Sequence, residues 1–66
     1  METLADALPK EIERCYGLLE VYKEIGPVGN FASMMIRNDI AQAQQAMLEG
    51  DVVAMLRSYN TLKECE

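Results

Sequence analysis

The sequence predicts an all-α fold, namely a small three-helix bundle or antiparallel helical hairpins, in a single domain spanning residues 1–66. Apolar residues recur at intervals of three and four along three segments, which is the spacing of one face of a helix. No five-residue stretch alternates polar and apolar residues, so β-strands are not expected. Glycine and proline separate the three segments, and short connections make sequential helices antiparallel. The helices are expected over about residues 9–25, 28–49 and 52–64.

The first helix is expected to begin at Pro9, because proline suits the first helical position and restricts the residue before it. Residues 1–7 are then a short leader, mobile or one turn long. Thr3 and Asp6 have the spacing of a capping box for that turn.

Turn and capping residues define the second and third helices. Gly26 and Pro27 end the first helix, and the second begins either at Pro27 or at Asn30. Gly50 supplies the left-handed residue that ends the second helix, and Asp51 caps the third. The residues expected in the core are Ile12, Cys15, Leu19, Tyr22, Ile36, Ile40, Met47, Leu56, Tyr59 and Leu62.

Charge and composition exclude several classes of function. Eleven acidic residues against six basic ones give a net charge of −5. Nucleic acids and anionic membranes are bound through clustered basic residues, so neither is an expected partner. No apolar stretch approaches the ~20 residues that a transmembrane helix requires, and no signal-peptide pattern opens the chain. A cytoplasmic protein is expected.

The residue types that catalysis and cofactor binding require are missing or isolated. There is no histidine for acid–base chemistry at neutral pH, and the glycines do not form a phosphate-binding loop. Cys15 and Cys65 have neither CxxC nor zinc-ligand spacing, so both are expected to be free thiols. No enzymatic activity, catalytic residue, cofactor or metal site is therefore expected.

The middle helix is the most informative segment for function. Between Pro27 and Leu48 the only charged residues are Arg37 and Asp39, although a helix exposed to water usually carries many charges. One interpretation is that neighbouring helices wrap this segment or that its outer apolar residues are ordinary exposed ones. The other is a contact with a protein partner, most simply a second copy in a dimer. The residues expected in this contact are Phe31, Met34, Met35, Ala41 and Leu48.

Two resemblances accompany these patterns. The segment from Ala46 through Tyr59 to Leu62, with small residues near a Gly-Asp turn, resembles the helical hairpin of a tetratricopeptide-type repeat. One repeat cannot stack, so this resemblance implies no function. The size, acidity and helical hairpins are also similar to those of small accessory proteins of bacteria and phages.

Three hypotheses for the function follow. The first is a non-enzymatic, self-associating interaction module that binds or holds another protein. The alternative is an acidic regulator, of the antitoxin or anti-repressor type, that masks a basic surface of a nucleic-acid-binding protein. A third, a thiol-dependent enzyme, rests only on Cys15 and Cys65.

Overall fold

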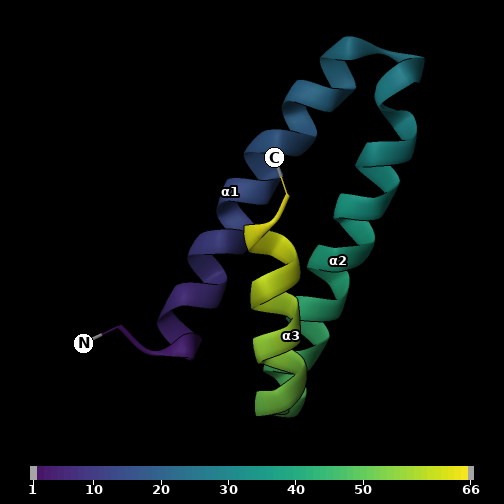
Figure 1. Cartoon of the computed structure of the whole chain (residues 1–66). Helices are drawn as coiled ribbons and strands as arrows, with labels where there is room; N and C mark the ends of the chain where they lie inside the picture. The colour runs from purple at the N-terminus through teal and green to yellow at the C-terminus, as the bar shows by residue number, and fades with distance from the viewer. Residues whose placement is uncertain (1, 66) are drawn as a thin grey trace.

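The computed structural model describes residues 2–65, and these residues form three α-helices that all contact one another (Figure 1). The helices are α1 (Leu4–Ile25), α2 (Asn30–Glu49) and α3 (Val52–Lys63). A 3₁₀ turn, η1 (Pro27–Gly29), connects α1 to α2. The described residues contain no strand, so the expected small three-helix bundle is confirmed.

The first helix begins at Leu4, and the expected start at Pro9 is wrong. The Thr3 hydroxyl accepts a hydrogen bond from the Asp6 backbone N–H at 3.3 Å, and the Asp6 carboxylate accepts one from the Thr3 N–H at 3.4 Å. Pro9 lies in the second turn of α1, where it removes a single backbone hydrogen bond. Burial of Leu8 and the capping box offset this loss. Most of the expected leader therefore belongs to α1, while Met1 lies outside the described residues.

The two connections follow the turn chemistry read from the sequence. Gly26 has a φ of 91°, and the chain then makes the 3₁₀ turn at Pro27 before α2 begins at Asn30. Gly50 is left-handed, with a φ of 68°. The Asp51 carboxylate accepts a hydrogen bond from the Ala54 N–H at 3.1 Å, which confirms that it caps α3.

The core lies where the three helices meet. Of the ten residues expected there, six are buried: Ile12, Cys15, Leu19, Ile36, Ile40 and Leu62. Tyr22 and Tyr59 are half-buried against this core. The other buried apolar residues are Leu8, Ala43, Ala46 and Met55. Ser33 is buried as well, and its hydroxyl has no hydrogen-bond partner among the described protein atoms.

Two expected core residues, Met47 and Leu56, are exposed, so their assignment was wrong. Ala46 is buried in place of Met47, and Met55 is buried in place of Leu56. Adjacent positions on a helix differ by about 100°, so a small rotation of the buried face exchanges them. The packing of the three helices against one another sets this rotation and buries Ala46 and Met55.

The third helix is too short to cover the whole α1–α2 pair. It contains 12 residues, whereas α1 contains 22 and α2 contains 20. At the rise of an α-helix, α3 is ~12–15 Å shorter than its neighbours. Figure 1 shows α3 beside only the lower part of the α1–α2 pair, ending near the middle of α1. The upper part is therefore a two-helix pair without a third neighbour.

Candidate interaction surface

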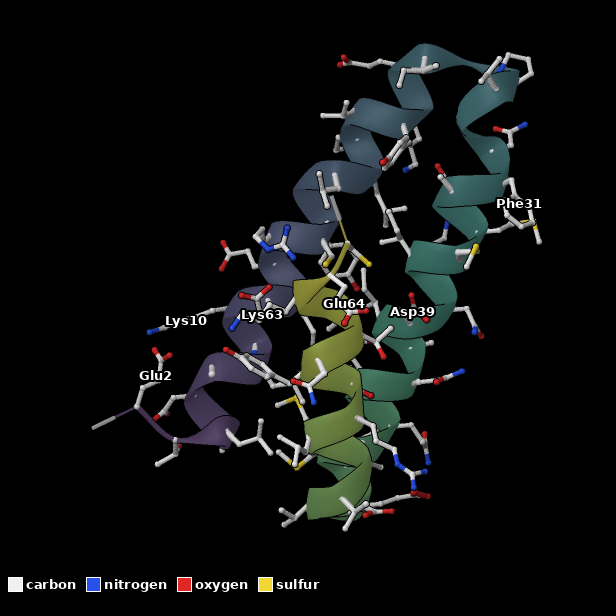
Figure 2. The ribbon with its side chains drawn as sticks, viewed as in Figure 1. Glu2, Lys10, Phe31, Asp39, Lys63 and Glu64 are labelled. Atoms are coloured by element: carbon white, nitrogen blue, oxygen red, sulfur yellow. The ribbon has the colours of Figure 1, made fainter. Side chains whose placement is uncertain are left out.

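All five residues expected in a contact lie outside the core. Phe31, Met34 and Met35 are in the first two turns of α2 and are 72%, 66% and 53% exposed. Ala41 is exposed in the middle of α2, and Leu48 is 84% exposed in its last turn. Figure 2 shows Phe31 projecting from α2 away from the other two helices. In the isolated chain these side chains are thus exposed and available to a partner protein.

The five residues do not form one continuous patch. Phe31 and Leu48 are 17 positions apart on one helix, which corresponds to ~25 Å. Phe31, Met34 and Met35 are close together at the amino end of α2, and we refer to them as the Phe31 cluster. Ala41 has too small a side chain to join this cluster to Leu48. A partner could therefore contact the Phe31 cluster without contacting Leu48.

Other exposed apolar side chains lie near the two ends of α2 and were not expected from the sequence. Val28 in η1 is 87% exposed and precedes the Phe31 cluster by one turn. At the opposite end, Val52 and Val53 begin α3 and are 67% and 63% exposed. Nothing in the residue pattern distinguishes them from buried valines, because their exposure depends on where the neighbouring helices end.

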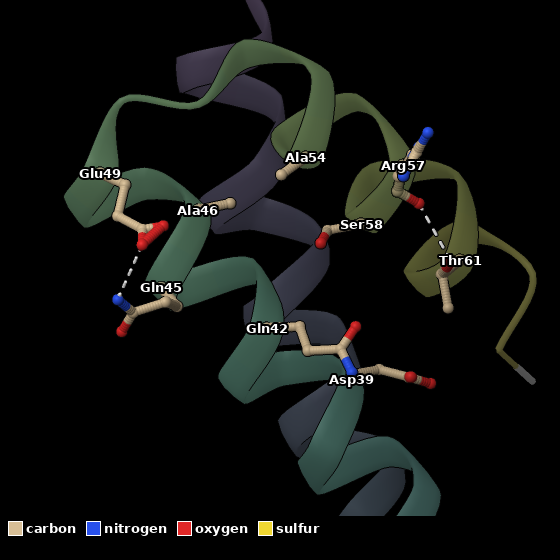
Figure 3. Close-up of a pocket in the computed structure, with 9 residues that line it drawn as sticks. All are labelled: Asp39, Gln42, Gln45, Ala46, Glu49, Ala54, Arg57, Ser58 and Thr61. Atoms are coloured by element: carbon tan, nitrogen blue, oxygen red, sulfur yellow. Dashed lines mark hydrogen bonds between the residues drawn. The ribbon is translucent and has the colours of Figure 1, made fainter.

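A groove of about 330 Å³, lined mostly by polar and charged residues, lies between α2 and α3 (Figure 3). Its side chains pair along their own helices: Gln45 donates to the Glu49 carboxylate at 3.3 Å, and the Thr61 hydroxyl donates to the Arg57 carbonyl at 2.9 Å. Within residues 2–65, no three His, Cys, Asp or Glu side chains are grouped so that they could hold a metal ion.

A smaller groove of about 210 Å³ lies where α3 ends, between α1 and α2. Tyr22 of α1 and the α2 residues Ala32 and Ile36 contribute to its wall. Met35 of the Phe31 cluster and Cys65 also line it. The apolar surface of the Phe31 cluster therefore continues into this groove.

The charged side chains are concentrated on α1. Arg14 pairs with Glu11 at 2.8 Å, and Lys23 is 3.7 Å from Glu20. Lys10 pairs with Glu2 at the amino end, where Figure 2 shows the two side chains together. No helix within residues 2–65 is both long enough and apolar enough to span a membrane. The surface is thus divided into a charged α1 and a charge-poor α2.

The two cysteines, which are 50 positions apart in sequence, meet at the end of α3. The buried Cys15 thiol donates to the Leu62 carbonyl at 3.5 Å, and the Cys65 backbone N–H donates to the same oxygen at 3.1 Å. Arg14 also donates to the Leu62 and Cys65 carbonyls, at 2.5 and 2.9 Å. A guanidinium at the last carbonyls of a helix satisfies them and complements the helix dipole.

Burial governs the acidity of both thiols. It raises the pKa of Cys15 to about 11, with a further contribution from the nearby Cys65. Burial also raises the pKa of Cys65, and the carboxylate of Asp39 acts in the same direction. No spacing rule in the sequence signalled this pairing, because it depends on how α3 packs against α1.

Comparison of the chain with protein-family models, curated proteins and solved structures found no match. The function proposed below therefore rests on the residues and their geometry.

Proposed function

We propose that the protein is a non-enzymatic helical interaction module of the cytoplasm that self-associates, with a dimer favoured, and that it also binds or holds another protein. The partner at the Phe31 cluster is a second copy of the chain. The observation that carries this proposal is the exposure of Phe31, Met34 and Met35 on a helix almost free of charge. A soluble helix usually exposes charged side chains at such positions.

The surface area of the chain supports self-association. Its accessible surface is 4697 Å², whereas a folded monomer of 7.4 kDa is expected to have about 4,200 Å². The excess of roughly 500 Å² per chain, about 1,000 Å² for two chains, equals the smallest area that a biological interface is expected to bury; a standard interface buries about 1,600 Å². The radius of gyration, 12.1 Å, also exceeds the ~10.8 Å expected for this length. A second copy on the uncovered apolar surface would bury part of the excess surface area.

Charge favours α2 over α1 as the contact between two copies. Each copy has a net charge of −5, and the exposed acids Glu13, Glu20 and Glu24 lie on α1. Two α1 surfaces facing each other would bring like charges together. The segment from Pro27 to Leu48 carries only Arg37 and Asp39, which have opposite signs. Contact through α2 therefore avoids the repulsion.

The solution mass of the full chain tests this proposal. Light scattering over a wide concentration range is expected to show a dimer, and Met34→Glu is expected to weaken the dimer at least tenfold by placing a charge in the contact. Val53→Glu is the matched control, because Val53 is equally exposed but lies at the other end of the molecule. Leu48→Glu shows whether the carboxyl end of α2 also contributes to the dimer contact.

Circular dichroism of each variant checks that the helices are retained. A wild-type chain that stays monomeric at all concentrations would refute self-association. A dimer that survives Met34→Glu would place the contact away from the Phe31 cluster.

A second candidate function is an acidic regulator that masks a basic surface of a nucleic-acid-binding protein. The exposed acids of α1 and the net charge of −5 support it. Such binding weakens strongly with added salt, whereas apolar association does not. Salt dependence of partner binding therefore separates the two candidate functions.

A further inference from the structure

We propose that Cys15 and Cys65 form a thiol–disulfide exchange site, in which an intramolecular disulfide ties the end of α3 to the middle of α1. The chemical class of reactant is a low-molecular-weight disulfide such as oxidised glutathione. This site does not depend on self-association, because both cysteines belong to one chain and neither is in the Phe31 cluster.

The geometry brings the two side chains together. Cys15 is fully buried in the core, and Cys65 is half-buried against it. The Cys15 thiol and the Cys65 backbone N–H both donate to the Leu62 carbonyl, and the Cys65 thiol donates to the Thr61 carbonyl, one residue earlier, at 3.5 Å. A disulfide requires Cα atoms about 4.4–6.8 Å apart. Closing the bond requires the two sulfurs to turn from the Leu62 and Thr61 carbonyls toward each other.

The surroundings assign a different role to each sulfur. Cys65 is the more accessible cysteine, and it lines the small groove at the end of α3. The Cys15 thiol is fully buried and donates to the Leu62 carbonyl, so the core shields it from a reagent in solution. The Arg14 guanidinium favours the thiolate form of both residues. Cys65 is thus the attacking sulfur and Cys15 the resolving one.

The reaction has two exchange steps. The Cys65 thiolate attacks one sulfur of oxidised glutathione, the disulfide bond of the reagent breaks, and one glutathione thiolate leaves. The Cys15 thiol then loses its proton to solvent and attacks the Cys65 sulfur, which releases the second glutathione thiolate. The two protein thiols are oxidised by two electrons, and one small-molecule disulfide is reduced to two thiols. Because burial raises the pKa of both thiols, the reaction is expected to accelerate above neutral pH.

The product closes a loop of about 50 residues that contains the second half of α1 and all of α2 and α3. A disulfide around a loop of this length restricts the unfolded chain more than the folded one. We expect the oxidised protein to have a Tm higher by roughly 10 °C or more. The disulfide also fixes the end of α3 to α1. In the reduced protein, hydrogen bonds from Arg14 hold this end in place.

Incubation of the full chain with oxidised glutathione at mildly alkaline pH tests the proposal. Intact mass spectrometry is expected to show a monomer that has lost two hydrogen atoms, and non-reducing peptide mapping is expected to join Cys15 to Cys65. The rise in Tm is expected to disappear on addition of dithiothreitol. Cys15→Ala, which keeps a small apolar side chain in the core, is expected to stop at a glutathione adduct on Cys65. Cys65→Ser is expected to prevent the reaction.

Three outcomes would overturn the proposal. One is a disulfide only between chains, and another is a stable glutathione adduct on both cysteines of the wild-type protein. The third is no reaction in the native protein under conditions in which the urea-unfolded chain forms the internal disulfide. The unfolded chain serves as the control for the reagent.

Discussion

Ile40→Ala is expected to lower the free energy of unfolding by about 2–5 kcal/mol, the largest effect of any substitution considered. Ile40 is 2% exposed in the middle of α2, where the helix packs into the core. Alanine removes apolar contacts and leaves a cavity that close-packed neighbours fill only in part. A chain of 66 residues has only a few kcal/mol of net stability, so this loss can unfold it. Urea denaturation followed by circular dichroism measures the change.

Leu56→Ala is the matched control for this prediction. Leu56 belongs to the apolar stripe of α3 by sequence, but 52% of its surface is exposed. Its truncation is expected to cost less than half of the loss at Ile40, because half of the side chain remains in water. Equal losses at Ile40 and Leu56 would show that Leu56 is a core residue and would contradict the packing of α3 described above.

Gly29→Ala is expected to destabilise the protein by about 1–3 kcal/mol. A Cβ atom at Gly29 would lie 2.2 Å from the backbone carbonyl oxygen of Tyr22, which is closer than any van der Waals contact. The carbonyl belongs to α1 and cannot turn away as a flexible side chain could. Either η1 or the end of α1 must shift, which strains the connection between α1 and α2.

Gly17→Ala provides the opposite control. Gly17 is exposed within α1, and a Cβ atom there would meet no heavy atom within 4 Å. Because glycine is a poor helix former, alanine is expected to stabilise the protein by about 0.5–1 kcal/mol. Thermal denaturation should therefore show a lower Tm than the wild type for Gly29→Ala and a higher Tm for Gly17→Ala. A stabilising Gly29→Ala would contradict the close approach of η1 to α1.

Elements governed by local chemistry were predictable from the sequence. The left-handed Gly50 and the Asp51 cap define the turn between α2 and α3, and both act through backbone groups within one helical turn. The wrong prediction that the first helix begins at Pro9 also concerns interactions within a few residues. A proline favours a helix start locally, but burial of Leu8 and the Thr3 capping box outweigh one missing hydrogen bond.

The sequence predicted which residues of α2 lie outside the core, and their part in a contact stays a prediction. Phe31, Met34 and Met35 are exposed in the single chain, on the side of α2 away from its buried stripe, where the sequence placed them. Their separation from Leu48 and their continuity with a groove depend on where α3 ends. The meeting of Cys15 and Cys65 depends on the same feature, and residues 50 positions apart carry no local signal of it.

The sequence by itself determined that this protein has three helices, where its turns lie and which segment is poor in charge. These properties follow from the periodicity of apolar residues and from backbone preferences, which act over a few neighbouring positions. Only the tertiary structure decided that Ala46 and Met55 are buried in place of Met47 and Leu56, and that the two cysteines adjoin. The physical reason is that the apolar face of each helix is wider than the area that the neighbouring helices cover. Helix length and helix rotation then select the buried side chains.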